Sequence, residues 1–335
     1  MPNILLTYSC VRNCPYCFAS DEKNKSSKPK FLSWNNLVYI ADLCSAAGER
    51  KIQLLGGEPT LHPDFLDMTI YLLERGFDIT VFTSGILKNK ALADISSALA
   101  NTPANRLTFN CNLNDPEQTP SPMAEQESVR SFLSQLGYRT TPGFNIYRTD
   151  FKLEFLFQTI SEFGMFRMIR LGLTHPVPGS SNSYISPGEI PGVYSRLCSY
   201  VPYMERFKIR LRFDCGFPYC GLDKDQLSSL YPIVNGAFHF NCAPIIDIGP
   251  DMTVWSCFPL RNYQRRSIFD FDSLDQIKDH FRKLHDIIRV EEAGIYEECD
   301  GCVWREDKLC SGGCLGHGVK KFREEYPLRM REVYP

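Results

Sequence analysis

The chain has 335 residues, of which 43% are hydrophobic and 23% are charged, so it can bury the core of one large domain, or of one domain and a smaller module. Its 37 Lys and Arg residues nearly balance 39 Asp and Glu residues, for a formal net charge of -2. This balance gives no bulk electrostatic reason to bind nucleic acid or an anionic membrane. The sequence has no run near the roughly 20 apolar residues that span a bilayer and no signal peptide, which predicts a cytoplasmic protein.

Short β-like runs alternate with longer helical patterns through the first half of the chain. The expected strands are residues 3–8, 51–57, 78–85, 106–113, 141–148 and 166–173. The expected helices are residues 33–47, 62–75, 88–100, 123–136 and 152–163. This alternation predicts parallel strand–helix–strand units with right-handed crossovers. We therefore expect an α/β fold, built as a partial (β/α)6 TIM-like barrel whose reactive face lies at the carboxyl ends of the strands.

The pattern changes in the second half of the chain. Beyond about residue 180 the alternation fades, and proline, glycine and cysteine become dense. We expect the barrel to occupy residues 1–205 and a C-terminal cysteine-rich module to occupy residues 206–335.

The 14 cysteines are the most informative residues. A chain without export signals stays in a reducing compartment, where thiols serve metal binding or catalysis more often than disulfides. Cys44, Cys111 and Cys198 stand singly in apolar surroundings and are expected to pack in the core. The others form an early and a late group: Cys10, Cys14 and Cys17, then Cys215, Cys220, Cys242, Cys257, Cys299, Cys302, Cys310 and Cys314.

The early group follows the first expected strand, at the reactive face. Thiolates bind both zinc and iron–sulfur clusters, but a structural zinc site takes four ligands, whereas a four-iron cluster held by three cysteines leaves one iron open. An open iron can bind a small molecule. The alternative is a zinc site completed by a distant fourth ligand.

The run "CVRNCPYC", which contains Cys10, Cys14 and Cys17, resembles the C-x-x-x-C-x-x-C signature of the radical S-adenosylmethionine (radical SAM) enzymes. The resemblance implies a [4Fe-4S] cluster on these cysteines, with S-adenosylmethionine bound to the open iron. It also implies reductive cleavage of S-adenosylmethionine, giving a 5′-deoxyadenosyl radical that abstracts hydrogen from the substrate.

A second run, "LLGGEPTLHPDF", ends the second strand and resembles the stretch with which this family holds the methionine amine. The resemblance implies that Gly56 and Gly57 allow a close backbone approach and that Glu58 accepts from the ammonium. "FTSGI" similarly matches a Thr/Ser-Asn-Gly stretch near the cofactor, with Ser84 where asparagine is more usual. The alternative for the two glycines is an ordinary turn.

The same resemblance implies further contacts at later strand ends. Tyr16 is expected against the adenine and Asn112 against the ribose. Arg148 is expected at the methionine carboxylate, and Leu171 or Leu173 beside the adenine. The alternative for Asn112 and Arg148 is a solvated side chain.

The late runs "CAPIIDIGPDMTVWSC" and "CDGCVWREDKLCSGGC" resemble the SPASM module, the auxiliary-cluster domain of radical SAM enzymes that mature peptides and proteins. This chain departs from the module in three ways. Met252 stands where a glycine is usual, the seven-residue gap before Cys310 is longer than usual, and no closing cysteine follows Cys314.

Eight late cysteines match the number that two four-iron clusters need. By family order, the first auxiliary cluster would use Cys242, Cys257, Cys314 and one of Cys215 or Cys220. The second would use Cys299, Cys302 and Cys310, completed by the remaining cysteine of that pair or by a ligand other than cysteine. One or two auxiliary [4Fe-4S] clusters are thus expected, and zinc stays an alternative for the last group.

Auxiliary clusters favour net oxidation of the substrate, because a substrate radical that forms a bond or loses a proton must release one electron. Asp214 and His175 are candidate general bases on the reactive face, and the alternative for each is a turn or supporting residue.

The resemblance implies a radical SAM oxidoreductase that matures ribosomal peptides (RiPPs) by cross-linking, thioether formation, desaturation or a similar oxidation. The expected partners are a peptide or protein substrate and an electron donor such as flavodoxin or ferredoxin. Because the chain opens on its first strand, we expect leader recognition by a separate protein or by the barrel rim. The alternatives are oxidation of a small metabolite and a non-catalytic iron–sulfur electron carrier.

Overall fold

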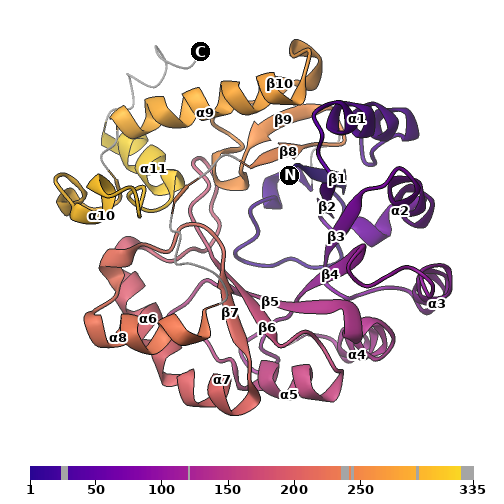
Figure 1. Cartoon of the computed structure of the whole chain (residues 1–335), viewed down its shortest axis with the longest axis horizontal. Coiled ribbons are helices and arrows are strands. Elements are labelled where there is room, and N and C mark those ends of the chain that lie inside the picture. Colours follow the sequence, from indigo (N-terminus) through magenta and orange to yellow (C-terminus); the bar gives the residue numbers. More distant parts are fainter. Residues whose placement is uncertain (24–28, 120, 235–240, 243–244, 292–293, 326–335) are drawn as a thin grey trace.

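The computed structural model describes residues 1–23, 29–119, 121–234, 241–242, 245–291 and 294–325. Seven parallel strands form a curved sheet with helices on its outer side (Figure 1). The strands are β1 (Asn3–Thr7), β2 (Lys51–Gly56), β3 (Asp78–Thr83), β4 (Leu107–Asn112), β5 (Thr140–Ile146), β6 (Met168–Leu173) and β7 (Arg210–Phe213). Five of the first six lie within the expected ranges and β5 begins one residue before its range, at Thr140, so the α/β partial barrel is confirmed.

Helices follow the strands in the expected order. They are α1 (Trp34–Ala46), α2 (Phe65–Glu74), α3 (Asn89–Ala98), α4 (Met123–Leu136), α5 (Glu154–Glu162), α6 (Ile190–Ser199), α7 (Val201–Phe207) and α8 (Lys224–Leu230). In α1 the Ser33 hydroxyl accepts from the Asn36 amide at 3.2 Å, so Ser33 is the N-cap. None of the helices in the described ranges is long and apolar enough to cross a membrane.

The last third of the chain extends the same sheet at its other edge. Strands β8 (Ile246–Ile248), β9 (Thr253–Ser256) and β10 (Arg266–Ser267) give the order β10-β9-β8-β1-β2-β3-β4-β5-β6-β7. β8 pairs parallel to β1, and β9 is antiparallel to β8. Helices α9 (Leu274–Glu291), α10 (Val303–Glu306) and α11 (Leu315–Glu325) lie at this end of the sheet (Figure 1). The expected domain division, between residues 205 and 206, falls inside α7 and stays a prediction.

The turn between β8 and β9 explains one departure from the SPASM pattern. Met252 has a φ of 58°, in the left-handed region that glycine adopts without cost. Its side chain is buried and packs in the main core. Burial of this side chain offsets a backbone penalty of roughly 1–2 kcal/mol.

The three isolated cysteines differ in burial. Cys44 and Cys111 are fully buried in the core, as expected. Cys198 is only half-buried, because it lies on α6 beside α8 and its thiol faces the Gln226 carbonyl at 3.9 Å.

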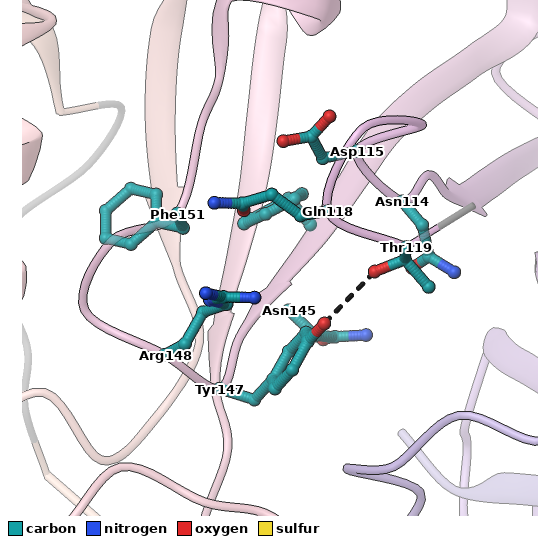
Figure 2. Close-up of a pocket in the computed structure, with 9 residues that line it drawn as sticks. Asn114, Asp115, Gln118, Thr119, Asn145, Tyr147, Arg148 and Phe151 are labelled. Carbon is teal, nitrogen blue, oxygen red and sulfur yellow. Dashed lines mark hydrogen bonds between the residues drawn. The ribbon is translucent and has the colours of Figure 1, made fainter.

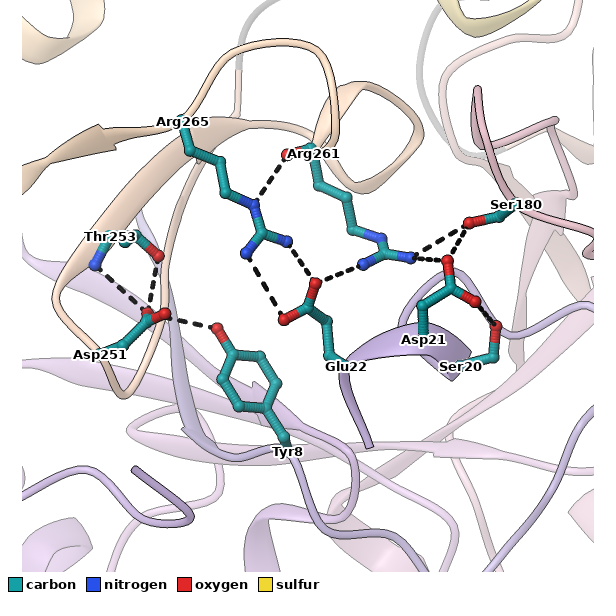
Figure 3. A network of polar contacts seen from close by, with 9 residues as sticks. All are labelled: Tyr8, Ser20, Asp21, Glu22, Ser180, Asp251, Thr253, Arg261 and Arg265. Atoms are coloured by element: carbon teal, nitrogen blue, oxygen red, sulfur yellow. Dashed lines mark hydrogen bonds and ion pairs between the residues drawn. The ribbon is translucent and has the colours of Figure 1, made fainter. Parts of the chain in front are cut away.

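A buried ion-pair network joins the segment after the early cysteines to the C-terminal part of the chain (Figure 3). Glu22 is almost fully buried and accepts from Arg261 Nη1 at 2.8 Å and from Arg265 Nη2 at 2.7 Å. Arg261, which is fully buried, also donates to Asp21 at 3.0 Å. Ser180, in the loop after β6, donates to Asp21 as well. The network therefore holds together three segments that are distant from one another in the sequence.

Replacing Arg261 tests how strongly this network holds the fold. Arg261→Met leaves the buried Glu22 carboxylate with one of its two guanidinium partners, so we expect a loss of about 3–5 kcal/mol in the free energy of unfolding. The control is Arg130→Met, which removes an exposed pair with Glu162 and should cost less than about 1 kcal/mol. Urea unfolding under anaerobic conditions measures both, and equal losses would contradict a special role for the buried network.

Candidate active site

The early cysteines occupy the segment that leaves β1 at its carboxyl end. Cys10, Cys14 and Cys17 are half-exposed free thiols, and the Cys17 amide donates to the Cys14 carbonyl at 3.1 Å. Burial raises the pKa of the Cys10 and Cys14 thiols. These thiols therefore need a positively charged group, such as a metal, to ionise fully at neutral pH.

Contacts with two other parts of the barrel fix the position of this segment. The Arg12 guanidinium donates to the carbonyl of Asn112, at the end of β4, at 2.8 Å. The Ser183 amide, in the loop after β6, donates to the Pro15 carbonyl at 2.9 Å. The cysteine segment is therefore held across the carboxyl edge of the sheet.

Gly56 and Gly57 are required where β2 ends against the exit of β1. A Cβ atom on Gly57 would lie 2.2 Å from the Ser9 carbonyl oxygen, and one on Gly56 would lie 2.4 Å from that of Thr7. The Gly57 amide donates to the Thr7 carbonyl at 2.8 Å. The close approach that the sequence predicted is thus made by the chain's own backbone, directly before Cys10.

Glu58 is fully buried, and its carboxylate already accepts several hydrogen bonds. Oε1 accepts from the hydroxyls of Thr60 and Thr83, both at 2.8 Å. Oε2 accepts from the amide and hydroxyl of Ser84 at 2.7 and 2.6 Å. These bonds use the roughly four acceptor positions of a carboxylate, so Glu58 can accept from an ammonium only by exchanging one of them. Glu58 and Ser84 together tie the end of β2 to the end of β3.

The other expected cofactor contacts differ in their surroundings. The Tyr16 hydroxyl donates to Asn114 at 2.9 Å and its ring lies 4.9 Å from that of Tyr147, while the buried Asn112 Oδ1 has no hydrogen-bond partner. Leu171 is fully buried within β6. Arg148 is partly exposed and paired with Asp150, so it can reach a carboxylate only by leaving that partner.

A pocket lies beside Tyr16, between the segments that follow β4 and β5 (Figure 2). Its lining combines aromatic rings with side-chain amides. The lining residues are Asn114, Asp115, Gln118, Thr119, Phe144, Asn145, Tyr147, Arg148 and Phe151. Sequence reasoning missed all of these except Arg148. The sequence signal that could have found them is the group of polar residues that directly follows two strands expected to be neighbours in the sheet.

The late cysteines divide into two sets of four by which thiols raise the pKa of one another, and the second set also lines one cavity. The Cys257 set contains Cys215, Cys242, Cys257 and Cys314. Burial raises the pKa of the Cys257 thiol well above its usual value, and the neighbouring thiols of Cys242, Cys314 and Cys215 raise it further.

The Cys220 set contains Cys220, Cys299, Cys302 and Cys310. Burial, with these three neighbouring thiols, raises the pKa of Cys220 to about 11. All four cysteines line one cavity. Across the described ranges, no group of three His, Cys, Asp or Glu side chains is arranged to hold a single metal ion.

The two candidate bases both lie next to Cys215. Asp214 pairs with Arg170 of β6, and burial raises the pKa of its carboxyl although Arg170 opposes the shift. His175 is buried, and burial lowers its pKa to about 4, so it is neutral at pH 7. Its Nδ1 lies 3.4 Å from His317 Nε2. Asp214 is partly exposed, whereas His175 faces the interior.

Residues 4–132 match the Radical SAM superfamily. This part of the chain is a radical SAM domain, and its cofactors are S-adenosylmethionine and a [4Fe-4S] cluster. Three observations fit these cofactors to the residues present: three free thiols, the unpaired Oδ1 of Asn112 and the close packing at Gly57 that fixes the cysteine segment.

Curated relatives match shorter stretches. The chain is 32% identical over 95 residues to GTP 3',8-cyclase of Haemophilus influenzae, covering 28% of each chain. It is 36% identical over 91 residues to the mitochondrial GTP 3',8-cyclase of Arabidopsis thaliana, covering 27% of this chain and 23% of that protein. These alignments therefore span about a quarter of those relatives. A probable GTP 3',8-cyclase of Methanopyrus kandleri is 24% identical over 61% of this chain and 65% of its own length.

Solved structures resemble the chain over almost its whole length. Streptococcus suis SuiB bound to S-adenosylmethionine aligns with a TM-score of 0.67 and 19% identity, over 95% of this chain and 73% of that one. Native anSMEcpe with bound AdoMet aligns with a TM-score of 0.65 and 15% identity, over 99% of both chains. At these identities the likeness shows a shared fold.

Gly57→Ala tests the packing that fixes the cysteine segment. Its Cβ would collide with the Ser9 backbone, so the segment that carries Cys10 must shift. We expect the rate of 5′-deoxyadenosine formation to fall by about tenfold or more, as a loss of about 1.4 kcal/mol in transition-state stabilisation produces. The control is Gly188→Ala, whose Cβ would meet nothing within 4 Å. An unchanged rate in Gly57→Ala would show that the close contact is not needed.

Proposed function

We propose that this chain, which carries a radical SAM domain over residues 4–132, is an oxidoreductase that matures a peptide or protein. When bound, S-adenosylmethionine and the cluster supply a 5′-deoxyadenosyl radical that takes hydrogen from the substrate. The observation that carries the proposal is the presence of eight more cysteines in the part of the chain that extends the same sheet, four of which line one cavity.

The number of electrons that the substrate must release connects these thiols to oxidation of the substrate. A substrate that has lost a hydrogen atom and then forms a bond or loses a proton must release one electron. Thiolate-held iron–sulfur clusters accept single electrons, whereas a redox-neutral isomerisation needs no acceptor. The favoured products are therefore a cross-link, a thioether, a desaturated residue or a similar oxidation. A flavodoxin or ferredoxin would supply the electron for each cleavage of S-adenosylmethionine.

The barrel residues have separate tasks in this proposal. Cys10, Cys14 and Cys17 would hold the cluster. Asn112 Oδ1, buried and unpaired, would accept from a ribose hydroxyl, and the Tyr16 ring would lie against the adenine. The remaining expected contacts, at Gly56, Gly57, Glu58, Ser84, Arg148 and Leu171, would position or enclose the cofactor.

Asp214 is the better placed of the two candidate bases. Its carboxylate is partly exposed, and Arg170 fixes its orientation. Asp214 also adjoins Cys215, so a proton and an electron would leave the substrate in the same direction. His175, which faces the interior, would support Cys215.

The substrate class is the part of the proposal that the experiment must decide. One solved SuiB structure that shares this fold holds the precursor peptide SuiA, and the SPASM-like runs favour a peptide for this chain. The curated relatives, named GTP 3',8-cyclase, favour the second candidate, a nucleotide or another small metabolite. A separate leader-binding protein is a further proposed partner.

The decisive assay is anaerobic turnover of the reconstituted protein with S-adenosylmethionine and a reductant. We expect 5′-deoxyadenosine, together with a mass change in a peptide encoded beside the gene. Modification of GTP or a free amino acid, with no turnover of any peptide, would favour the small-metabolite function. Absence of 5′-deoxyadenosine under all conditions would instead favour an electron carrier.

Replacing Cys10, Cys14 and Cys17 together by Ala should abolish 5′-deoxyadenosine formation, because these thiols are the cluster's proposed anchors. Iron bound by the late cysteines should remain. The matched control is Cys198→Ala, since Cys198 belongs to none of the three groups, and it should keep full activity. Cleavage that persists in the triple variant would overturn the assignment.

A further inference from the structure

The connection between β7 and α8 places two thiols at two different sites. Cys215 comes directly after Asp214 and belongs to the Cys257 set, whereas Cys220 lies on a short 3-10 helix, Tyr219–Gly221. Only four residues lie between them along the chain, yet Cys220 lines a cavity with Cys299, Cys302 and Cys310. The order of the cysteines along the sequence could not show which of Cys215 and Cys220 belongs to which site.

The barrel side of the molecule fixes the position of Cys220. The Tyr194 hydroxyl of α6 donates to the Pro218 carbonyl at 3.1 Å. A Cβ atom on Gly221 would lie 2.7 Å from Ile190 and 2.8 Å from Tyr194, so the short helix packs tightly on α6. The Tyr219 ring stacks on that of Trp304, with centroids 4.6 Å apart and planes 11° from parallel. Cys220 is therefore held on the wall of the cavity.

The opposite wall comes from the C-terminal segments. A Cβ atom on Gly294 would lie 2.6 Å from the Cys299 sulfur, so glycine leaves room there for the thiol. The Gly312 amide donates to the Cys310 sulfur at 3.4 Å, a bond that stabilises a thiolate. The Arg305 guanidinium donates to the Cys299 carbonyl at 2.7 Å.

The cavity contains no alternative fourth ligand among its lining residues. Besides the four cysteines these are Pro218, Ile295, Tyr296, Trp304, Arg305 and Gly312, with no carboxylate or imidazole. The single hydroxyl, that of Tyr296, donates to the Pro187 carbonyl. The donors are thus four thiols, a number that suits a [4Fe-4S] cluster.

We infer that Cys220 is the fourth ligand of a [4Fe-4S] cluster held by Cys299, Cys302 and Cys310. This deepens the proposed function and rests on it. Cys220 thereby replaces the closing cysteine that the C-terminal sequence lacks. With a thiolate on every iron, this cluster has no iron open to substrate, so it transfers electrons. Cys215 completes the Cys257 set, and one short connection anchors both sites.

Cys220→Ala in the full-length protein, purified anaerobically, tests the assignment. We expect about four fewer irons per chain than in the wild type, or a three-iron cluster signal in the EPR spectrum, because the cluster loses a ligand. Cys299→Ala should give the same loss, and Cys198→Ala none. Retention of wild-type iron and spectra by Cys220→Ala, while Cys299→Ala loses iron, would overturn the inference. Zinc bound by the Cys220 set in the wild type would also overturn it.

Cleavage of S-adenosylmethionine without added substrate is a second measurement. It distinguishes the loss of one cluster ligand from a folding defect and from failure of the proposed function. Cys10, Cys14 and Cys17 are unaltered in Cys220→Ala, so we expect the variant to retain most of the cleavage of S-adenosylmethionine without added substrate. Loss of both cleavage and all iron would show collapse of the fold and would contradict a local role. Should no peptide be modified by the wild type, the iron loss in Cys220→Ala still supports the ligand assignment.

Discussion

The pairing of β8 with β1 is the constraint that joins the cysteine-rich C-terminal segments to the barrel. Asn3 and Ile4 of β1 align with Asp247 and Ile248 of β8, and the Asn3 amide donates to the buried Asp247 carboxyl at 2.6 Å. β1 leads directly into the early cysteines, and the parallel β8 ends at the same edge of the sheet, where Asp251 in the following turn accepts from the Tyr8 hydroxyl. β9 is antiparallel to β8 and returns the chain to the other edge, where Cys257 follows it. The ion pairs between Glu22 and Arg261 then join the segments that follow these strands.

The barrel could be predicted from the sequence because its signals are local. Each of the first six strands is a β-like run of five to seven residues followed by a helix, and the early cysteines lie within eight consecutive residues. The strands β7–β10 have only two to four residues each. Such short runs carry no usable period, and they form here because the edges of an existing sheet offer backbone partners.

The contacts that refine the site are not local, and the sequence could not supply them. Glu58 was expected at the cofactor, but its carboxylate accepts from Thr83 and Ser84 at the end of the next strand. Cys220 was expected at either auxiliary site, and its place depends on how the short helix packs on α6. Motif spacing predicts which residue types perform the chemistry. Tertiary packing determines which of these side chains come into contact.

The central claim is that three groups of cysteines hold three four-iron clusters in one chain. Quantifying iron, sulfide and zinc in anaerobically purified protein tests it most directly. We expect about 12 irons per chain, a matching amount of sulfide and no tightly bound zinc. About eight irons would leave one of the late sets without a cluster, and about four irons with zinc would make the late cysteines a zinc site; either result would contradict the claim.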